Sequence, residues 1–224
     1  FKDVFKKSRE DGSNSKTIQE SMIGLTQVIN RQTIMQFNVG FSYTSGYLTD
    51  PFKLLSVIES DKSDSRFGEN FQDTNSNNIY LYEARPDSKL RQSFYWQTKY
   101  SLYNGDMIDS SYRFMTDDWG INSHTLDFRY RWYFTLNKER DSYLEPHLRY
   151  YNQSAADFYQ RYINSDDYQS GDPNFSFASA DERLSEMNAV TFGLKYGWRY
   201  QEGKEANVKL EYYIQSHSGK KCIG

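Results

Sequence analysis

Cysteine, histidine and proline are scarce in this chain of 224 residues. The single cysteine, Cys222, excludes a disulfide framework and a cysteine-rich metal site. The three histidines form no His-Glu-x-x-His motif, and the chain has no glycine-rich phosphate loop. We therefore expect no cofactor, no bound metal and no enzymatic activity.

Long apolar runs are also missing. No stretch of 18 apolar residues occurs, which excludes a transmembrane helix, and hydrophobic residues make up only 37% of the chain. The net charge is −3 without a basic block, so nucleic acid is not an expected partner. Aromatic residues, in contrast, reach 17%, with 20 tyrosines, and this abundance argues against a disordered chain.

The apolar residues alternate with polar ones. The segment 124–136 shows this most clearly, since its apolar side chains take every second position: Leu126, Phe128, Tyr130, Trp132, Phe134 and Leu136. The positions between them are mostly polar: Asp127, Arg129, Arg131, Tyr133 and Thr135. Successive side chains of a β-strand point to opposite faces, so this period of two predicts a strand with one apolar face.

The same alternation recurs along most of the chain. It predicts seven strands at 33–44, 88–103, 106–116, 124–136, 143–153, 188–200 and 206–215. An eighth strand is expected at 16–29, where the alternation is less regular. We therefore predict an all-β fold, an antiparallel up-and-down transmembrane β-barrel with about eight strands in this segment and more in the full chain.

The predicted connections are unequal. Short turns at 104–105, 137–140 and 201–205 fall at one end of the strands. Longer and acidic connections fall at the other end, at 45–87, 117–123 and 163–187. Short turns at one rim and long loops at the other are typical of outer-membrane barrels, and strands of this length suffice for a tilted bilayer crossing of about 9–11 residues.

The expected organisation is one barrel domain over 1–224. It has a connector at 1–16 and long loops at 47–87 and 163–187, and we expect it to be incomplete at the N-terminus and also at the C-terminus. A soluble β-barrel or sandwich is the alternative, because its strands alternate in the same way. Strand length, the unequal rims, and Tyr, Trp and Phe near the strand ends favour the membrane barrel.

Charged residues occupy the face opposite the apolar one. Nine of them are basic and four acidic, so this face carries about +5 and the rest of the chain about −8. A charge facing lipid at mid-bilayer costs about 2–4 kcal/mol, so in a membrane barrel these residues must line the lumen. With His147, the predicted lumen-facing residues are Arg91, Lys99, Asp109, Arg113, Asp127, Arg129, Arg131, Glu145, His147, Arg149, Lys195, Arg199, Lys209 and Glu211.

Two interpretations of this face remain open. A positive interior favours the passage of anions. Alternatively, arginine–carboxylate pairs and tyrosine hydroxyls fill the interior and hold the wall rigid, with no open path. His147 lies beside Glu145 and Arg149, which favours a hydrogen-bonding role in the lumen over a ligand role.

A second set of candidate residues lies at the long-loop rim: Asp50, Asp87, Asp117, Asp118, Trp119 and Asp157. The carboxylates of the five aspartates offer the oxygen ligands that Ca²⁺ takes, although turn capping is the commoner role of such residues. Ser123 and His124 follow two aspartates, an order that suggests a hydrolase at the barrel rim. Adjacent residues of a strand point to opposite faces, however, so this Ser–His pair cannot form the hydrogen bond that a catalytic triad requires.

Four motifs in these rim segments follow one another in order: GYLTDPFK at 46–53, YEARPDS at 82–88, DDWGINSHT at 117–125 and RYYNQSAADFY at 149–159. With them the chain, over roughly 22–215, resembles a large bacterial family of uncharacterised proteins regarded as outer-membrane β-barrels. The resemblance implies a Gram-negative outer-membrane location, a signal peptide and further N-terminal strands. It implies no activity and no ligand-binding or catalytic residues.

Two functions from different classes are then open. The first is a passage for small, preferably anionic, solutes or for a threaded substrate. The second is a non-conducting barrel that anchors an envelope lipoprotein or other subunits of an envelope or cell-surface complex through its rims. Membrane lipid is the expected partner of the barrel wall in both cases.

Overall fold

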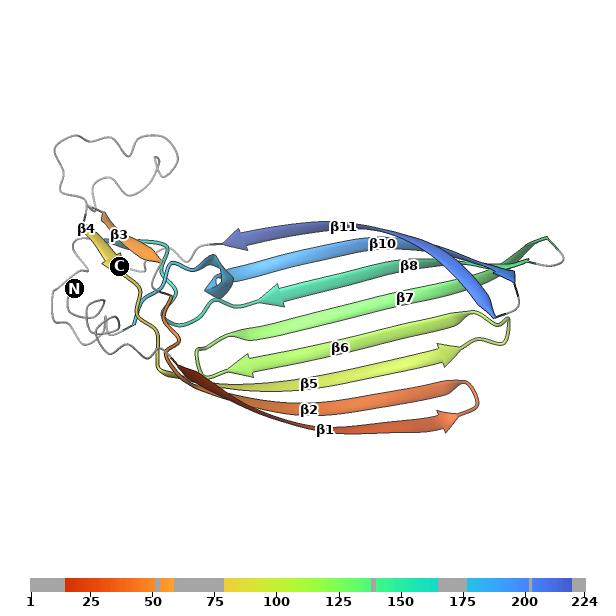
Figure 1. The fold of residues 1–224 in the computed structure, drawn as a ribbon, viewed down its shortest axis with the longest axis horizontal. Coiled ribbons are helices and arrows are strands. Elements are labelled where there is room, and N and C mark those ends of the chain that lie inside the picture. The colour runs from red at the N-terminus through yellow and green to blue at the C-terminus, as the bar shows by residue number, and fades with distance from the viewer. Residues whose placement is uncertain are drawn as a thin grey trace.

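A computed structural model describes residues 15–50, 53–58, 79–137, 140–164, 177–201 and 203–218. Eight long strands form one antiparallel sheet in the order β1-β2-β5-β6-β7-β8-β10-β11 (Figure 1). Their bounds are Lys16–Asn30 (β1), Thr33–Gly46 (β2), Ser88–Ser101 (β5), Met107–Asp117 (β6), Asn122–Asn137 (β7), Arg140–Gln153 (β8), Glu186–Gln201 (β10) and Lys204–Ser218 (β11). All eight predicted strands are thus confirmed, each within a few residues of its expected ends.

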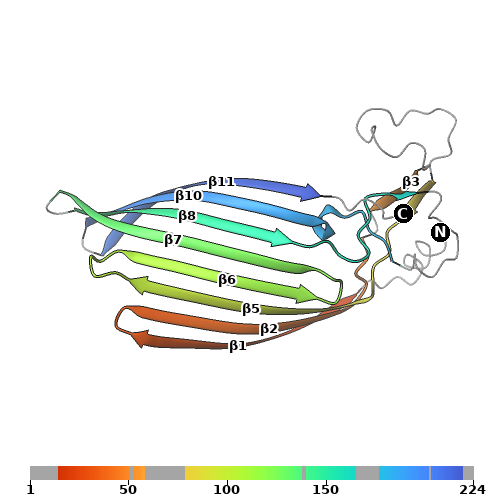
Figure 2. The same cartoon turned by 180° about the vertical axis from the view of Figure 1, so that it is seen from behind.

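The sheet is an open meander. Within the described residues β1 pairs only with β2, and β11 pairs only with β10. Figure 2, seen from behind, shows the same two strands as the free edges of a curved sheet. The all-β antiparallel meander is confirmed, whereas the predicted closure into a barrel is not seen among these strands.

The two ends of the sheet differ in their connections (Figure 1). At one end, the turn end, β5 and β6 are joined by residues 102–106, and β1 and β2 by Arg31 and Gln32. The other end, the loop end, holds the long connections from β2 to β5 and from β8 to β10. Parts of both predicted long loops, 59–78 and 165–176, lie outside the described residues, as does most of the predicted connector 1–16.

The long connections contain secondary structure that the alternation did not predict. Strands Leu54–Ile58 (β3), Ile79–Tyr82 (β4) and Ile163–Asn164 (β9) form a second sheet in the order β4-β3-β9. A 3₁₀ helix, Glu182–Leu184 (η3), precedes β10. These strands are too short for a period of two to stand out, so sequence patterning missed them.

Proline at position 146 fits into β8 because the ladder to β7 is interrupted there. The β7–β8 pairs run to Arg129↔His147 and resume at Trp132↔Leu144. Proline has no N–H to donate, so it is accommodated where that neighbour's hydrogen bonds are missing. On the other side, Pro146 lies opposite Leu194 of β10.

The buried core lies at the loop end and not within the long sheet. One apolar cluster contains Trp119, Ile121, Ala155, Ala156, Tyr159 and Leu184, and a second contains Leu55, Ile163 and Ala178. We call this folded loop-end region, residues 47–58, 79–87, 118–121 and 154–185 as far as they are described, the rim domain. Among the described residues, no helix is long and apolar enough to cross a membrane.

Candidate functional site: the polar face and the rim domain

The strand register assigns all fourteen predicted lumen-facing residues to one face of the large sheet. Rows of directly opposed residues show this, for example Lys99↔Asp109, Asp109↔Arg129 and Arg129↔His147. The opposite face carries the large apolar side chains, as in the row that joins Trp96, Tyr112 and Leu126. We refer to these two surfaces as the polar face and the apolar face.

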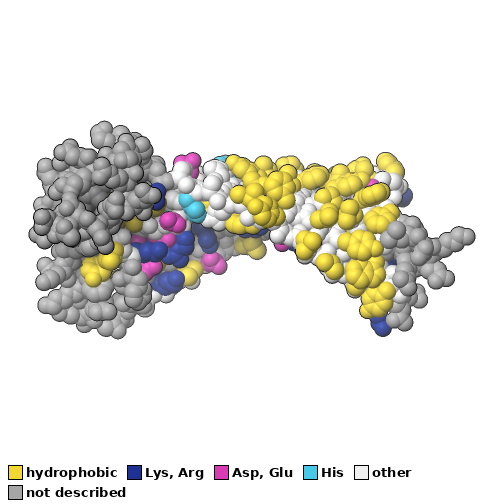
Figure 3. Space-filling model, turned by 90° about the horizontal axis from the view of Figure 1, so that it is seen from above, with side chains coloured by type: hydrophobic (Ala, Val, Ile, Leu, Met, Phe, Trp, Pro, Cys, Tyr) yellow, Lys and Arg dark blue, Asp and Glu magenta, His cyan; other side chains and the backbone are white. Residues whose placement is uncertain are grey.

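The apolar face is uncovered. Ile23, Leu25, Leu126, Trp132 and Leu210 are each more than half exposed, and many further large apolar side chains are exposed beside them. Figure 3 shows hydrophobic side chains extending along the sheet from its middle to the turn end. No second layer of strands or helices packs against this face within the part of the chain that is described.

Ion pairs bind most of the charged groups of the polar face to one another. Each of the four predicted carboxylates has a basic partner within 4.0 Å, and Arg91 pairs with a further acid, Glu20. The pairs are Arg91–Glu20 at 3.3 Å, Lys99–Asp109 at 3.8 Å, Arg129–Asp127 at 3.3 Å, Arg131–Glu145 at 2.6 Å and Lys209–Glu211 at 2.7 Å. The interpretation of this face as a network of paired charges therefore has direct geometric support.

His147 joins three strands of this network. Its Nε2 lies 2.9 Å from Asp127 of β7, and its Nδ1 lies 3.1 Å from Glu211 of β11. The ring reaches β11 across Gly193 of β10, where a Cβ atom would come within 3.2 Å of it. The expected hydrogen-bonding role of His147 thus has a structural basis, because an imidazole can bond through both nitrogens.

Nearer the turn end, the Tyr143 side chain occupies the space left by the missing side chain of a glycine in β10. Its ring lies over Gly197, where a Cβ atom would approach ring atoms to 2.3 Å. The Arg131 guanidinium stands 4.5 Å from the ring centroid, and the Tyr143 hydroxyl donates a 2.6 Å hydrogen bond to Glu205. A tyrosine on a strand glycine, held by a cation and a carboxylate, fixes the spacing of β7, β8, β10 and β11 at this level.

Trp119 and Asp117 organise the hairpin between β6 and β7. The Asp117 Oδ1 accepts hydrogen bonds from the backbone N–H groups of Trp119 and Ile121, and Gly120 takes a φ of +82°. The Trp119 indole N–H donates to the Ser88 carbonyl at 2.9 Å. Lys89 pairs with Asp117 at 2.8 Å and lies over the Trp119 ring. Asp117 therefore acts as a turn cap.

The other rim aspartates are spread over separate turns. Asp87, Asp118 and Asp157 are exposed, and the Asp157 carboxylate lies against Gly120. Asp50 lies 3.7 Å from Arg183. Within the described residues, no three His, Cys, Asp or Glu side chains are grouped so that they could hold a metal ion.

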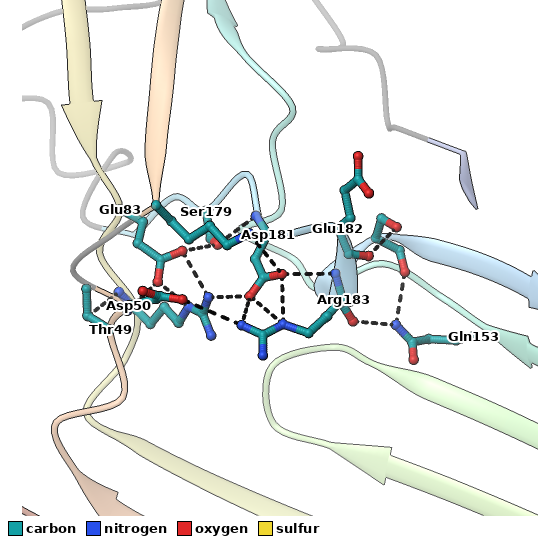
Figure 4. Close-up of polar contacts among 11 residues, drawn as sticks. Thr49, Asp50, Glu83, Gln153, Ser179, Asp181, Glu182 and Arg183 are labelled. Carbon is teal, nitrogen blue, oxygen red and sulfur yellow. Dashed lines mark hydrogen bonds and ion pairs between the residues drawn. The ribbon is translucent and has the colours of Figure 1, made fainter. Parts of the chain in front are cut away.

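A buried ionic cluster joins the two long connections, and we call it the clasp (Figure 4). Glu83 accepts hydrogen bonds from the Asp50 backbone, from Arg85 and from the Ser179 hydroxyl. Arg85 also reaches Asp181 at 2.8 Å. The side chains of Glu83 and Asp181 are almost fully buried, at 0% and 2% exposure, so their charges depend on these partners.

Asp181 is the centre of the second half of the clasp. Burial raises the pKa of its carboxyl, but hydrogen bonds from the Arg183 side chain and backbone and from Arg85 outweigh this effect and hold the pKa well below its usual value. Behind Arg183, Gln153 donates hydrogen bonds to the carbonyls of Arg183 and Ser185. The clasp is thereby fixed to the end of β8.

Sequence reasoning missed the clasp residues Glu83, Arg85, Ser179, Asp181 and Arg183. A signal was present, since Glu83 and Arg85 belong to the YEARPDS motif, but the sequence assigned no role to either residue. Their partners stand 96 residues away along the chain, as for Arg85 and Asp181, and nothing in the local pattern identifies them.

Ser123 and His124 lie on opposite faces of β7, as expected. Ser123 is buried on the polar face, whereas His124 lies on the apolar face, where its Nδ1 is 2.7 Å from the Tyr112 hydroxyl. The ring of Phe114 packs beside His124, with centroids 5.1 Å apart. The contacts of His124 given by the described residues are therefore aromatic, and Ser123 lies on the other face of the strand.

The chain matches one known protein family. A family model described as "Protein of unknown function (DUF3570)" matches residues 1–224. The chain belongs to the DUF3570 family. No curated protein and no solved structure matches the chain. The family assignment covers all of the elements described above and carries no stated activity, so any function must be argued from the two faces and the rim domain.

Proposed function

We propose that this DUF3570 chain forms part of an integral outer-membrane β-barrel whose apolar face contacts lipid and whose polar face lines a water-filled passage for small, preferably anionic, solutes or for a threaded substrate. The observation that carries the proposal is the division of the large sheet into an uncovered face with most of its large apolar side chains and an opposite face with the predicted charged residues. In this barrel, further strands pair with the free edges of β1 and β11.

The energetics of the apolar face support a lipid environment. Soluble proteins rarely expose contiguous apolar surface of more than a few hundred Å², because each buried Å² contributes roughly 25 cal/mol. Here exposed aromatic and aliphatic side chains lie on seven of the eight strands, all except β6. In a soluble sandwich a second layer would cover them, and the described residues supply none.

The strand dimensions also support the proposal. The eight strands are 11 to 16 residues long, and a tilted β-strand crosses a bilayer in about 9–11 residues. The charged residues of the polar face would be costly in lipid and inexpensive in a hydrated interior. A positive excess along a hydrated wall lowers the energy of anions and raises that of cations.

The rim domain supports the scaffold function as a second candidate. Its two apolar clusters and its clasp make a folded surface at the loop end, in contrast to the short turns of the other end. Such a surface suits the docking of an envelope lipoprotein or another complex subunit. We propose no enzymatic activity for either candidate, since Ser123 and His124 diverge.

Conductance of the full-length protein tests the passage. Purified protein reconstituted into planar bilayers should give stepwise conductance that requires correctly folded protein. Absence of conductance from protein that is inserted and folded would contradict the passage. Native purification then separates the alternatives, because a scaffold should carry a stoichiometric partner and a passage need not.

A further inference from the structure

The pairing on the polar face separates its basic residues into two groups. Five of the nine predicted cations have carboxylate partners, and Arg199 interacts with another group. Arg113, Arg149 and Lys195 have no carboxylate within 4.0 Å in the described parts of the chain. Asp127 and Glu145, which lie opposite Arg149 and Lys195, pair with Arg129 and Arg131 instead. A carboxylate in contact with a cation largely cancels its charge at a distance, so the positive excess of this face comes mainly from the cations without such a contact.

These three cations lie at successively greater distances from the loop end of the sheet. Arg113 lies opposite Thr125, in the row that continues to Tyr151, near the loop end. Arg149 lies one row of side chains further toward the turn end, opposite Asp127 and Thr191. Lys195 lies two rows beyond that, opposite Glu145. The series therefore runs from β6 through β8 to β10.

The steps are short enough for one anion to pass between them. With strands about 4.8 Å apart and a rise of about 3.4 Å per residue, the Cα atoms of Arg113 and Arg149 are about 12 Å apart, and those of Arg149 and Lys195 about 14 Å. Long Arg and Lys side chains span much of these distances. A small anion can thus leave one cation as it enters the field of the next.

Tyrosine rings hold two of these three side chains without neutralising them. The Arg113 guanidinium stands 5.3 Å from the centroid of the Tyr95 ring, and the Lys195 ammonium stands 5.3 Å from that of Tyr143. A tyrosine ring attracts a cation through its quadrupole and leaves the net charge in place. Arg113 and Arg149 are exposed on the polar face, and Lys195 is half-buried there.

We infer that Arg113, Arg149 and Lys195 form the anion-binding series that sets the charge selectivity of the passage, whereas the ion-paired cations serve to hold the wall. The ligand class is a small inorganic or organic anion such as chloride, phosphate or a carboxylate. This inference rests on the proposed passage, and it names the residues that act in it.

The test compares two sets of variants of the full-length protein in planar bilayers. Arg113→Gln, Arg149→Gln and Lys195→Gln together should reduce the anion-to-cation permeability ratio, read from the reversal potential in a KCl gradient, to about 1. The control also removes three cations, but together with their partners: Lys99→Gln with Asp109→Asn, Arg131→Gln with Glu145→Gln, and Lys209→Gln with Glu211→Gln. It should keep the ratio of the parent protein.

An equal loss of selectivity in both sets would overturn the inference while leaving the passage intact. A folded protein that conducts nothing would instead contradict the passage. A second measurement then tests whether Arg113 and Arg149 bind anions. Phosphate should slow phenylglyoxal modification of Arg113 and Arg149, measured by mass spectrometry, more than that of the paired Arg129 and Arg131. Equal rates with and without phosphate would overturn the anion series.

Discussion

The large sheet and the rim domain differ in how they expose their apolar and charged side chains. The rim domain buries its apolar residues and its charges, as Trp119 at 6% exposure and Glu83 at 1% show. The sheet exposes both kinds, with Trp132 at 51% on one face and the Arg91–Glu20 pair on the other. A region that buries its apolar groups can be stable in water by itself, whereas the apolar face of the sheet needs an apolar environment.

This contrast assigns different roles to the same residue types. In the rim domain a tryptophan is core, and an arginine such as Arg85 compensates buried carboxylates. In the sheet a tryptophan such as Trp132 is exposed on the apolar face, and an arginine such as Arg91 is half-exposed beside its partner. Matched substitutions in the two regions therefore test the comparison directly, and we give them in order of decreasing effect.

The largest effect is expected for the tryptophan pair. Trp119→Ala should lower the free energy of local opening of the rim domain by about 3–5 kcal/mol, because it leaves a cavity in the Trp119 cluster and removes the bond to Ser88. Trp132→Ala should leave the rim domain unchanged. Hydrogen–deuterium exchange of residues 118–121 and 154–164 measures the local opening of the rim domain in both variants. Equal opening in the two variants would refute a separate rim core.

Removal of Arg85, the central arginine of the clasp, should destabilise the rim domain nearly as much as Trp119→Ala does. Arg85→Ala leaves Glu83 and Asp181 buried with fewer cationic partners, and loss of one member of a buried ionic cluster costs about 3–5 kcal/mol. Arg91→Ala breaks the exposed pair with Glu20 and should cost about 1 kcal/mol or less. Exchange rates of residues 79–87 and 177–185 should rise in the first variant and stay constant in the second.

Adjacent serines of β6 probe the two faces of the sheet. Ser110 lies between Thr98 and Phe128 on the apolar face, and Ser111 lies between Gln97 and Asp127 on the polar face. In a membrane barrel Ser110→Arg should destabilise the folded, lipid-inserted state by about 2–4 kcal/mol, and Ser111→Arg should have little effect.

Urea titration of protein refolded into lipid vesicles measures this difference between the serine variants. Ser111→Arg is the control for the added bulk and charge. A larger cost for Ser111→Arg than for Ser110→Arg would show that lipid does not cover the apolar face.

Acid should loosen the rim domain before the sheet, with the smallest effect of the four. The pKa of Asp181 lies below its usual value of 3.8, so the clasp contributes stability above that value and loses it as the pH falls through the lowered pKa. The protection factors of the rim amides, which are corrected for the intrinsic pH dependence of amide exchange, should therefore fall toward low pH. Asp181→Asn should remove most of this fall, and an unchanged pH profile of the protection factors would contradict the role of Asp181.

The strands and their faces could be predicted from local alternation, because a period of two already fixes which side chains share a face. Leu126 to Leu136 needed no tertiary information, and even Lys16–Asn30 was recognised through a weaker pattern. Closure of the sheet was not predictable in this way, since alternation is identical for an open sheet and a barrel.

The candidate sites depended more on partners far along the chain. The predicted residues of the polar face do share one face, but their sequence positions do not show which are neutralised. The register decides that Arg131 meets Glu145 while Arg113 meets Thr125. Trp119 was predicted from the sequence as a rim residue, whereas the clasp residues that lie near it in the fold were not predicted.

Eight amphipathic strands, an aromatic and apolar face, a charged face and unequal connections can be read from the order of the residues, because they follow from the geometry of each strand. The pairing of the charges, the folding of the long connections into a rim domain, and the meeting of Glu83, Arg85 and Asp181 in the clasp depend on how distant segments pack. Strand geometry acts over a few residues, whereas pairing and burial depend on contacts between segments up to 96 residues apart.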